Sequence, residues 1–584
     1  MVRKVMMLAM VALLGAPLLH AIPLFHHHEK HDRRFFKPVP LTPRQQELVQ
    51  EAIAREKVTL TQVEKSTPLV QTYIQDMRPD VKLYQVPVSD QYMIGRVDFS
   101  KAFRADEYAV RNYNEPEKKG RLHFFSGSFA FMSKLTQMFH LEFNPTGFMS
   151  MMFVDPTGFD QQHYTFSFVR REFLGNVRTW VFDVEPTVPK PGRFLGRIWI
   201  EDQSGNIVRF NGTYLNNGND PVHHYFHFDS WRVNIQPDLW APMAVYVEDT
   251  LRNGPSHAES FRGQTTFWGY SLKLPTSESD QESMQIENAE DESANNGDVS
   301  PLQAQREWIS QAEQNVLDRL TQAGLLAPPS DFDKVLETVT NNLIISNNIQ
   351  MPSDIHCRVL LTEPLESLAV GNTILISKGL VDVLPNEPSL AAVIAFQLAH
   401  IIQGHHIDTR YAFSDRLLFP DSSTFQRIEM NHSSIDDQEA AKKAIELFNN
   451  SNYKGQDAAA GIFFEQVEAS DKKLPALFTP RLGDSLLAPN GQPWLLALTQ
   501  GAPRLNMDDL TQQAALPLNS RLKIDPWDDK VFLLHFTPAP LLNARDKMPL
   551  EITPLYFKLQ RYQQPAAPAA PAPATPAPGT NPPQ

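Results

Sequence analysis

The spacing of apolar and polar positions changes twice along the chain. Residues 41–80 carry apolar side chains at helical spacing, and Thr42 stands before a proline, which is typical of a helix start. From about residue 82 to 274 the spacing becomes alternation in short runs rich in aromatic and β-branched residues, such as HYTFSFVRREF and RFLGRIWIED, with turn signals between them. This pattern predicts a β-rich domain over residues 41–275, built from a helix and an antiparallel half-barrel or curved sheet.

Residues 276–303 separate that domain from the rest of the chain. They are acidic, polar and almost free of large apolar side chains, which predicts a disordered linker. Helical spacing returns in REWISQAEQNVLDRL and predicts a second domain, mostly helical with a small sheet, over residues 304–560. Residues 561–584 are rich in proline and alanine, which predicts a disordered tail. Because 584 residues are too many for one core, we expect a multidomain α+β protein.

The start of the chain predicts export. Two basic residues precede an apolar run over residues 6–19, and a cleavage signal ends at Ala21, which together indicate a signal peptide over residues 1–21. A retained anchor is the alternative, although a bilayer span needs about 20 apolar residues. Cys357 is the only cysteine, so no disulfide forms within the chain, which favours a bacterial periplasm or secretion. The formal charge of −14 argues against nucleic acid as a partner.

One helix of the second domain carries the candidate chemistry. A strand over residues 372–377 is followed by a helix that starts near Pro388 and continues past His400, in the run AFQLAHIIQGHH. This helix is apolar on nearly every side, which predicts a buried position. Gln397 and His400 are polar exceptions, and a buried polar group needs a partner.

The stretch from Leu368 to about His405 resembles zinc metallopeptidase family forty-eight, which includes the CAAX prenyl proteases and periplasmic barrel-assembly proteases. In that family a strand leads into a helix of the form A-A-V-x-A-H-E-L-A-H-x-x-x-G-H, and the counterpart here is AAVIAFQLAHIIQGHH. The two histidines of the family helix bind one zinc ion, and the glutamate between them is the general base. The resemblance implies a peptidase-like fold for residues 304–560.

The same resemblance implies that the chemistry is degenerate. Phe396 takes the place of the first zinc-binding histidine and Gln397 that of the general base, so we assign no catalytic residue. His400 remains as the second histidine, and Asp437 in DQEAA takes the place of the third ligand. His400 and Asp437 thus form a vestigial metal site. We expect no cofactor, because catalytic zinc sites usually have three protein ligands.

We therefore expect an exported, peptidase-like protein that binds polypeptide clients of the envelope without hydrolysing them. In the family an extended substrate pairs with the edge strand before the zinc helix. The resemblance implies Asn372, Ile374 and Ile376 as positions on that substrate-pairing strand.

The alternative from the enzyme class is an active zinc endopeptidase with a rearranged site. Such a site would use His400, Asp437 and either His405 or His406. If the helix continued through them, His405 and His406 would point about 140° and 120° away from His400, at about 100° per residue. Their recruitment would need the helix to end at Gly404.

A third function is predicted from the β-rich domain. The segment GRFLGRIWIEDQSGNIVRFNGTYL resembles the strand pair of outer-membrane lipoprotein-sorting carriers, in which a curved sheet surrounds an apolar cavity for acyl chains. This resemblance implies lipid as a second class of partner. The alternative is that the aromatic side chains of the domain fill an ordinary core, namely Phe166, Phe168, Trp180, Trp199 and Phe210.

Overall fold

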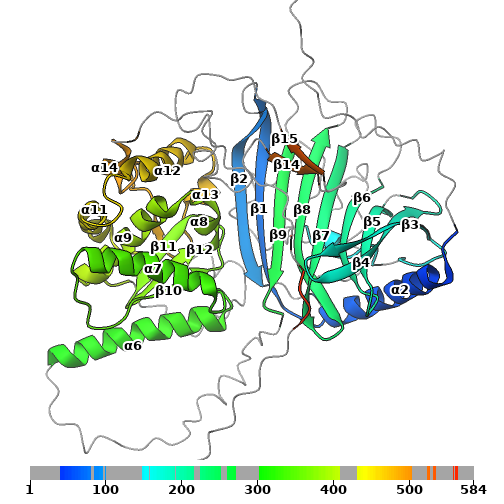
Figure 1. The fold of residues 1–584 in the computed structure, drawn as a ribbon, viewed down its shortest axis with the longest axis horizontal. Helices are drawn as coiled ribbons and strands as arrows, with labels where there is room; N and C mark the ends of the chain where they lie inside the picture. The colour runs from blue at the N-terminus through cyan, green and yellow to red at the C-terminus, as the bar shows by residue number, and fades with distance from the viewer. Residues whose placement is uncertain are drawn as a thin grey trace, which may run out of the picture.

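The computed structural model describes the chain in sections, namely residues 40–80, 84–96, 99, 148–156, 158–190, 192–215, 224–251, 260–270, 301–407, 430–500, 502, 522–525, 530–533, 557 and 559–562. The predicted signal peptide, residues 1–21, lies outside these sections. So do residues 276–300 of the predicted linker and residues 563–584 of the predicted tail. The described chain is of the predicted α+β class, with a large antiparallel sheet in its N-terminal part and helices around a small sheet in its C-terminal part (Figure 1).

The N-terminal part contains a nine-stranded antiparallel sheet that does not close into a barrel. Strands β3 to β9 form a meander and β9 pairs with β1, so that the strand order is β2-β1-β9-β8-β7-β6-β5-β4-β3. This confirms the predicted antiparallel sheet in the N-terminal domain. Its strands are β1 Leu69–Asp80, β2 Tyr84–Arg96, β3 Tyr164–Leu174, β4 Val177–Pro186, β5 Phe194–Glu201, β6 Ile207–Tyr214, β7 His224–Gln236, β8 Leu239–Leu251 and β9 Ser260–Trp268.

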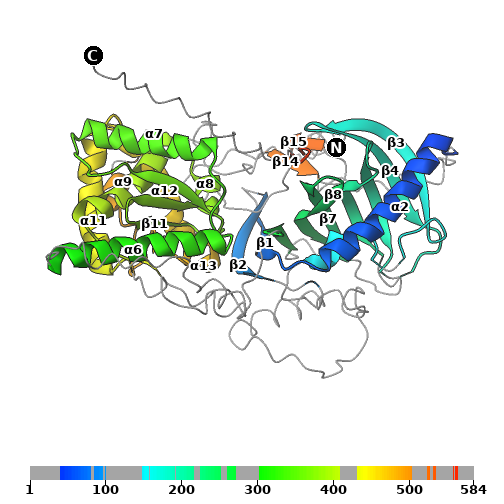
Figure 2. The same ribbon diagram turned by 90° about the horizontal axis from the view of Figure 1, so that it is seen from below.

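One face of this sheet is covered by helix α2, Pro43–Val63, which crosses the strands diagonally (Figure 2). The helix begins as predicted, because Thr42 and Gln45 exchange hydrogen bonds in a capping box. It ends at Val63, and residues 69–80, whose spacing also predicted a helix, form β1 instead. Both terminal nitrogens of Arg232, on β7, donate to the carboxylate of Glu56 at 2.7 Å, and both side chains are buried. A buried charge is tolerated only when paired, so this contact fixes α2 on the sheet.

Apolar side chains fill the space between α2 and the sheet. The short helix η2, Met149–Met152, lies in this core. Phe166 and Trp180 are at its margin, Phe168 is 38 % exposed, and Trp199 belongs to the opposite face. The buried aromatic side chains of the core include Phe148, Phe153, Phe159, Phe194, Phe210 and Phe228.

The opposite face of the sheet carries three buried tryptophans and is covered in part by residues 557 and 559–562. Phe557 lies with its ring centroid 5.4 Å from that of Trp231, and Leu559 is buried in the same cluster. The last residues of the predicted second domain, 304–560, therefore pack on the N-terminal sheet.

The C-terminal part surrounds a four-stranded mixed sheet of order β10-β12-β11-β13, and a separate pair is formed by β14 and β15. The strands are β10 His356–Leu360, β11 Glu366–Val370, β12 Thr373–Ser377, β13 Asp484–Ser485, β14 Leu522–Asp525 and β15 Lys530–Leu533. The helices are α6 Pro301–Gln322, α7 Asp331–Ser346, α8 Lys378–Val383, α9 Glu387–Gln403, α11 Ser434–Asn449, α12 Asp457–Ser470, α13 Pro475–Phe478 and α14 Leu496–Thr499. None of the helices in the described sections is long and apolar enough to cross a membrane.

The predicted substrate-pairing strand is not an edge strand. Asn372 lies in the turn before β12, and Ile374 and Ile376 lie within β12, which pairs with β10 on one side and β11 on the other. Its backbone groups are thus used within the sheet, and Ile374 and Ile376 are fully buried. The prediction that these residues pair with an extended substrate is wrong, because a strand with two neighbours has no free edge.

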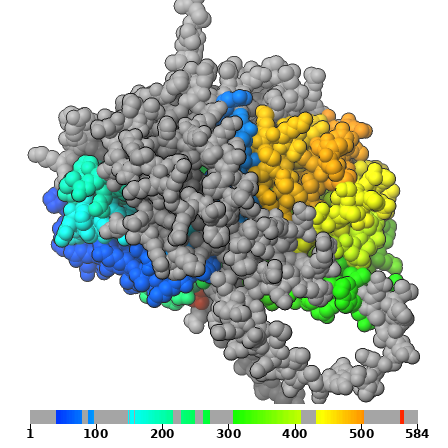
Figure 3. Space-filling view, turned by 180° about the vertical axis from the view of Figure 1, so that it is seen from behind, coloured from blue at the N-terminus to red at the C-terminus, as the bar shows by residue number. Residues whose placement is uncertain are grey.

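The two parts of the chain share a hydrophobic core. Tyr73, Tyr92 and Ile94, from β1 and β2, pack in the same cluster as the apolar side chains around α9. Trp268 at the end of β9 also donates its indole N–H to the carbonyl of Gly324 at 2.9 Å. Figure 3 shows the blue surface of β2 directly against the orange surface of the C-terminal part.

Candidate metal centre

Helix α9 is placed by local signals at both of its ends. Asn386 accepts a hydrogen bond from the backbone N–H of Ser389 at 3.0 Å, and Pro388 occupies the first turn. At the other end Gly404 adopts a left-handed conformation with φ of 71°, which ends the helix after Gln403. The residues between are nearly all buried, as the apolar pattern predicts.

Phe396 and Gln397, the positions at which the predicted resemblance to zinc peptidases breaks down, are both inside the protein. The ring of Phe396 lies edge-on to the ring of His400, with centroids 4.9 Å apart. Gln397 is fully buried and its amide nitrogen donates to Ser367 Oγ at 2.9 Å and to Asp484 Oδ2 at 3.2 Å. Neither side chain supplies a proton acceptor of the kind that a general base requires.

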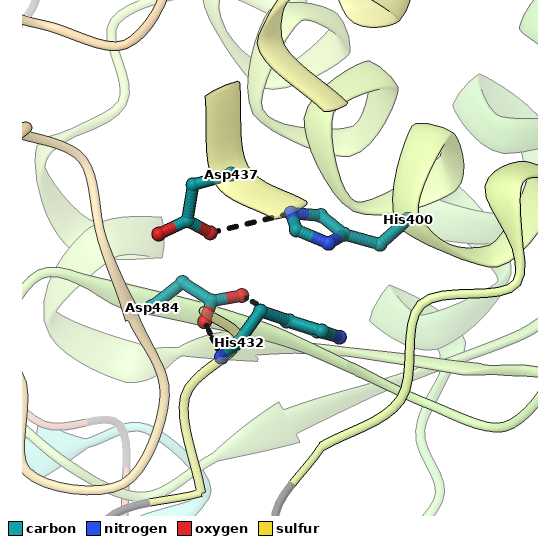
Figure 4. A group of neighbouring side chains, drawn as sticks. All are labelled: His400, His432, Asp437 and Asp484. Carbon is teal, nitrogen blue, oxygen red and sulfur yellow. Dashed lines mark hydrogen bonds and ion pairs between the residues drawn. The ribbon is translucent and has the colours of Figure 1, made fainter. Parts of the chain in front are cut away.

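Four buried side chains converge beside this helix, as Figure 4 shows. His400 comes from α9, His432 from the segment just before α11, Asp437 from α11 and Asp484 from β13. One nitrogen or oxygen of each lies within 4.8 Å of the corresponding atom of every other. The structure therefore brings together the predicted pair, His400 and Asp437, and adds two residues that the sequence did not indicate.

Asp484 orients the imidazole of His432. Its Oδ1 accepts the backbone N–H of His432 at 2.7 Å, and its Oδ2 lies 2.8 Å from the Nδ1 of the same residue. A carboxylate at this distance holds the hydrogen on Nδ1, which leaves the lone pair of Nε2 free as a ligand.

His405 orients the imidazole of His400 as Asp484 orients that of His432. Because the helix ends at Gly404, the chain turns back and His405 Nδ1 lies 3.1 Å from His400 Nδ1. The Nε2 of His405 is 3.8 Å from Asp436 and 3.7 Å from Glu439, two carboxylates that favour a hydrogen on that nitrogen. His405 then accepts from His400 Nδ1–H, and the lone pair of His400 Nε2 is free.

One of the two histidines after the helix differs from the helical expectation. His405 does not point away from His400, because residues 405 and 406 lie beyond the end of the helix. His406 does point elsewhere, and its Nδ1 lies 2.9 Å from Glu313 Oε1 on α6. His405 contacts the outer nitrogen of His400, so it does not replace the first histidine of the family helix.

Burial shifts the charge state of the predicted pair. Desolvation, and then the neighbouring His432, lower the pKa of His400 to about 3. Desolvation, and then the charges of Asp484 and Asp436, raise the pKa of Asp437 to about 8. At neutral pH, without a cation, His400 is therefore neutral and Asp437 is protonated.

The donor set fits a divalent transition metal. Among the described residues, His400 Nε2, His432 Nε2 and Asp437 Oδ1 are buried and make no hydrogen bond, and His400 Nε2 and Asp437 Oδ1 are 3.5 Å apart. Two imidazole nitrogens and a carboxylate oxygen are typical zinc ligands. Candidate ligand atoms of the four side chains lie within 4.8 Å of one another, whereas the ligands of a tetrahedral zinc ion with bonds of about 2.1 Å are roughly 3.4 Å apart, so binding would require the side chains to adjust.

Comparisons with known proteins identify no family. No family model and no curated protein matches the sequence. Among solved structures, the N-terminal β part is similar to a LolA superfamily protein from Nitrosomonas europaea. The match covers 36 % of this chain and 91 % of that chain, with 10 % identity and a TM-score of 0.18. The resemblance to the zinc peptidases remains a prediction from the residues.

Proposed function

We propose that this protein binds one zinc-class metal ion through His400, His432 and Asp437 and does not hydrolyse peptides. The observation that carries the metal is the convergence of four buried side chains, each of which offers a nitrogen or oxygen within 4.8 Å of those of the others. Three of these side chains, His400, His432 and Asp437, also have a buried atom that makes no hydrogen bond among the described residues. Leaving such groups buried and unpaired costs about 1–3 kcal/mol each, so a native cluster of them calls for an occupant. The zinc would hold α9, the segment before α11 and α11 itself together.

The absence of hydrolysis rests on the position of the general base. Gln397 occupies that position, and its amide is turned to Ser367 and Asp484. His400 and His432 are fully buried, whereas a catalytic zinc ion keeps an open position for water. Both features favour a structural site.

We further propose that the chain is exported and binds polypeptide clients of the envelope, on the basis of its N-terminal sequence and the resemblance to zinc peptidases. The client would use a surface other than β12, which has no free edge. For lipid as the partner, the aromatic core between α2 and the sheet is unfavourable, because the described side chains already occupy the space that acyl chains would need.

The metal is tested by titrating the purified full-length chain with zinc against a chromophoric chelator, together with elemental analysis. We expect about one zinc ion per chain. We also expect His432→Ala to weaken zinc binding by more than about 100-fold, because loss of a residue that only supports a ligand typically weakens it by about 10- to 100-fold. His163→Ala is the control, since that side chain is 44 % exposed and distant from the cluster. Failure to bind zinc, or an unchanged affinity in His432→Ala, would overturn the proposal.

Hydrolysis is tested separately with casein as substrate and zinc-loaded protein. We expect no cleavage above the level of a His400→Ala variant. Cleavage that a chelator abolishes would show an active endopeptidase with a rearranged site, and the non-hydrolytic part of the proposal would be wrong.

A further inference from the structure

Residues 475–485 connect the edge of the nine-stranded sheet to the candidate metal centre. The segment begins with α13 against β2 and ends with β13, which contains Asp484. At its start, the carboxylate of Asp90 on β2 accepts the backbone N–H groups of Ala476 and Leu477 at 2.9 and 2.8 Å. Asp90 also accepts the hydroxyl of Tyr73 at 3.0 Å and is only 8 % exposed. The sheet thus anchors the first residues of the segment.

The middle of the segment is held from two sides. Glu366 on β11 accepts the backbone N–H groups of Arg481, Leu482 and Gly483 at 2.7, 2.8 and 3.0 Å. The guanidinium of Arg481 lies 5.8 Å from the centre of the Tyr92 ring, on β2. Three consecutive residues are therefore fixed between β2 of the N-terminal part and β11 of the C-terminal part.

The end of the segment delivers a carboxylate to the metal centre. Asp484 pairs with Ser367 of β11 in the sheet. Its carboxylate accepts hydrogen bonds from the backbone N–H of His432 and the side-chain amide of Gln397, and it contacts the ring nitrogen Nδ1 of His432. A shift of the segment would move this carboxylate and, with it, the imidazole of His432. Ligand sites tolerate such shifts poorly, because outer partners set the orientation of the ligand.

We propose that the N-terminal sheet positions the metal ligands through residues 475–485. Asp90 and Tyr92 are then positioning residues, although they belong to the other part of the chain and touch no member of the cluster. This inference rests on the proposed metal binding. Because coupling between two equilibria is reciprocal, zinc must in turn tighten the attachment of the segment to the sheet.

The experiment compares zinc affinity and hydrogen exchange in full-length variants. We expect Asp90→Ala to weaken zinc binding by about 10-fold, the lower range for loss of an outer partner. We also expect zinc to slow amide exchange at residues 476–484 in the wild type and to do so less in Asp90→Ala. The matched control is Asp183→Ala, which removes a carboxylate paired with Arg197 elsewhere on the same sheet. This control should change zinc affinity less than 2-fold.

Arg481→Ala is the second variant, in case Asp90→Ala fails to fold. It removes the contact with Tyr92 and keeps the backbone bonds to Glu366, and we expect weaker zinc binding here also. If the wild type binds zinc and a folded Asp90→Ala or Arg481→Ala chain binds it equally well, the positioning role is wrong. If the wild type binds no zinc, the proposed metal function itself fails.

Discussion

Each of the two histidine ligands has a neighbour that determines which ring nitrogen carries the hydrogen. Asp484 does this for His432, and His405 does it for His400, so that both Nε2 atoms are buried and keep a free lone pair. The third ligand, Asp437, is affected differently: burial raises its pKa, so that its carboxyl group stays protonated near neutral pH when no cation is present. The stability of the metal-free protein should therefore depend on whether this carboxyl group keeps its proton.

We predict a fall in stability of the chelator-treated protein between pH 6.5 and 8. The folded pKa of Asp437 is about 8, against about 3.9 in the unfolded chain, so in that interval only the folded state holds this proton. His400, with a folded pKa of about 3, has the opposite effect, but only below its unfolded pKa of about 6.5. From about pH 4 to 6.5 the two effects oppose each other. Above 6.5 the effect of Asp437 is no longer opposed by His400, and it lowers the free energy of unfolding by about 1 kcal/mol per pH unit. His406, whose pKa is raised by its hydrogen bond with Glu313, adds to the fall.

Urea unfolding of the Asp437→Asn chain, in chelator at pH 6.5 and 8, tests this. The variant has no proton to lose at this position, so the fall should shrink to the smaller part that comes from His406. Asp436→Asn is the matched control, because that neighbouring carboxylate is partly exposed and its pKa is lowered, and it should keep most of the fall. An equal fall in Asp437→Asn and the wild type would contradict the prediction.

The end of one helix decides which histidines meet. The apolar pattern predicts α9 and its burial correctly, but it does not give the last residue of the helix. Gly404 ends α9 with φ of 71°, and this turn, rather than the helical repeat, brings His405 to His400. The position of His405 is therefore a property of the cap.

We predict that Gly404→Ala weakens both stability and zinc binding, whereas Gly455→Ala weakens stability alone. Both glycines have positive φ, 71° and 79°, and a methyl group at either would meet no described atom within 4 Å. The cost is therefore conformational, about 1 kcal/mol in each case. Only Gly404 places a residue that contacts the candidate ligands. Thermal melting and the zinc competition assay measure the two effects, and equal zinc affinity in the two variants would show that the cap does not position the site.

The two parts of the chain share buried contacts. Tyr73, Tyr92 and Ile94 of the sheet are buried in the core that surrounds α9, and Asp90 caps the backbone of the segment that leads to Asp484. An acidic linker permits independent domains, but buried contacts of this kind couple them.

We predict that the full-length chain unfolds in one cooperative transition. Scanning calorimetry should give a single peak, with the calorimetric enthalpy equal to the van't Hoff enthalpy. Tyr92→Ala removes a buried ring from the shared core and should separate the peak into two, because it weakens the interface more than either part. Two well-resolved transitions in the wild type would show that the parts fold independently.

The sequence by itself determined what is local. Strands β3 to β8, the start of α2 and the burial of α9 follow from periodicity, caps and residue types within short windows, whereas β1 lies in a stretch whose spacing predicted a helix. His400 and Asp437 were also assigned correctly as neighbours, through the resemblance to zinc peptidases.

Only the tertiary structure decided the rest of the site. His432 and Asp484 are 52 residues apart, and no spacing rule links either of them to His400. Likewise β12 has the alternation of any buried strand, and only the pairing of β10 and β11 on its two sides removes its free edge. Strand order and the meeting of these side chains depend on which segments, far apart in the sequence, pack against each other to bury apolar surface. A pattern within a short window does not contain that information.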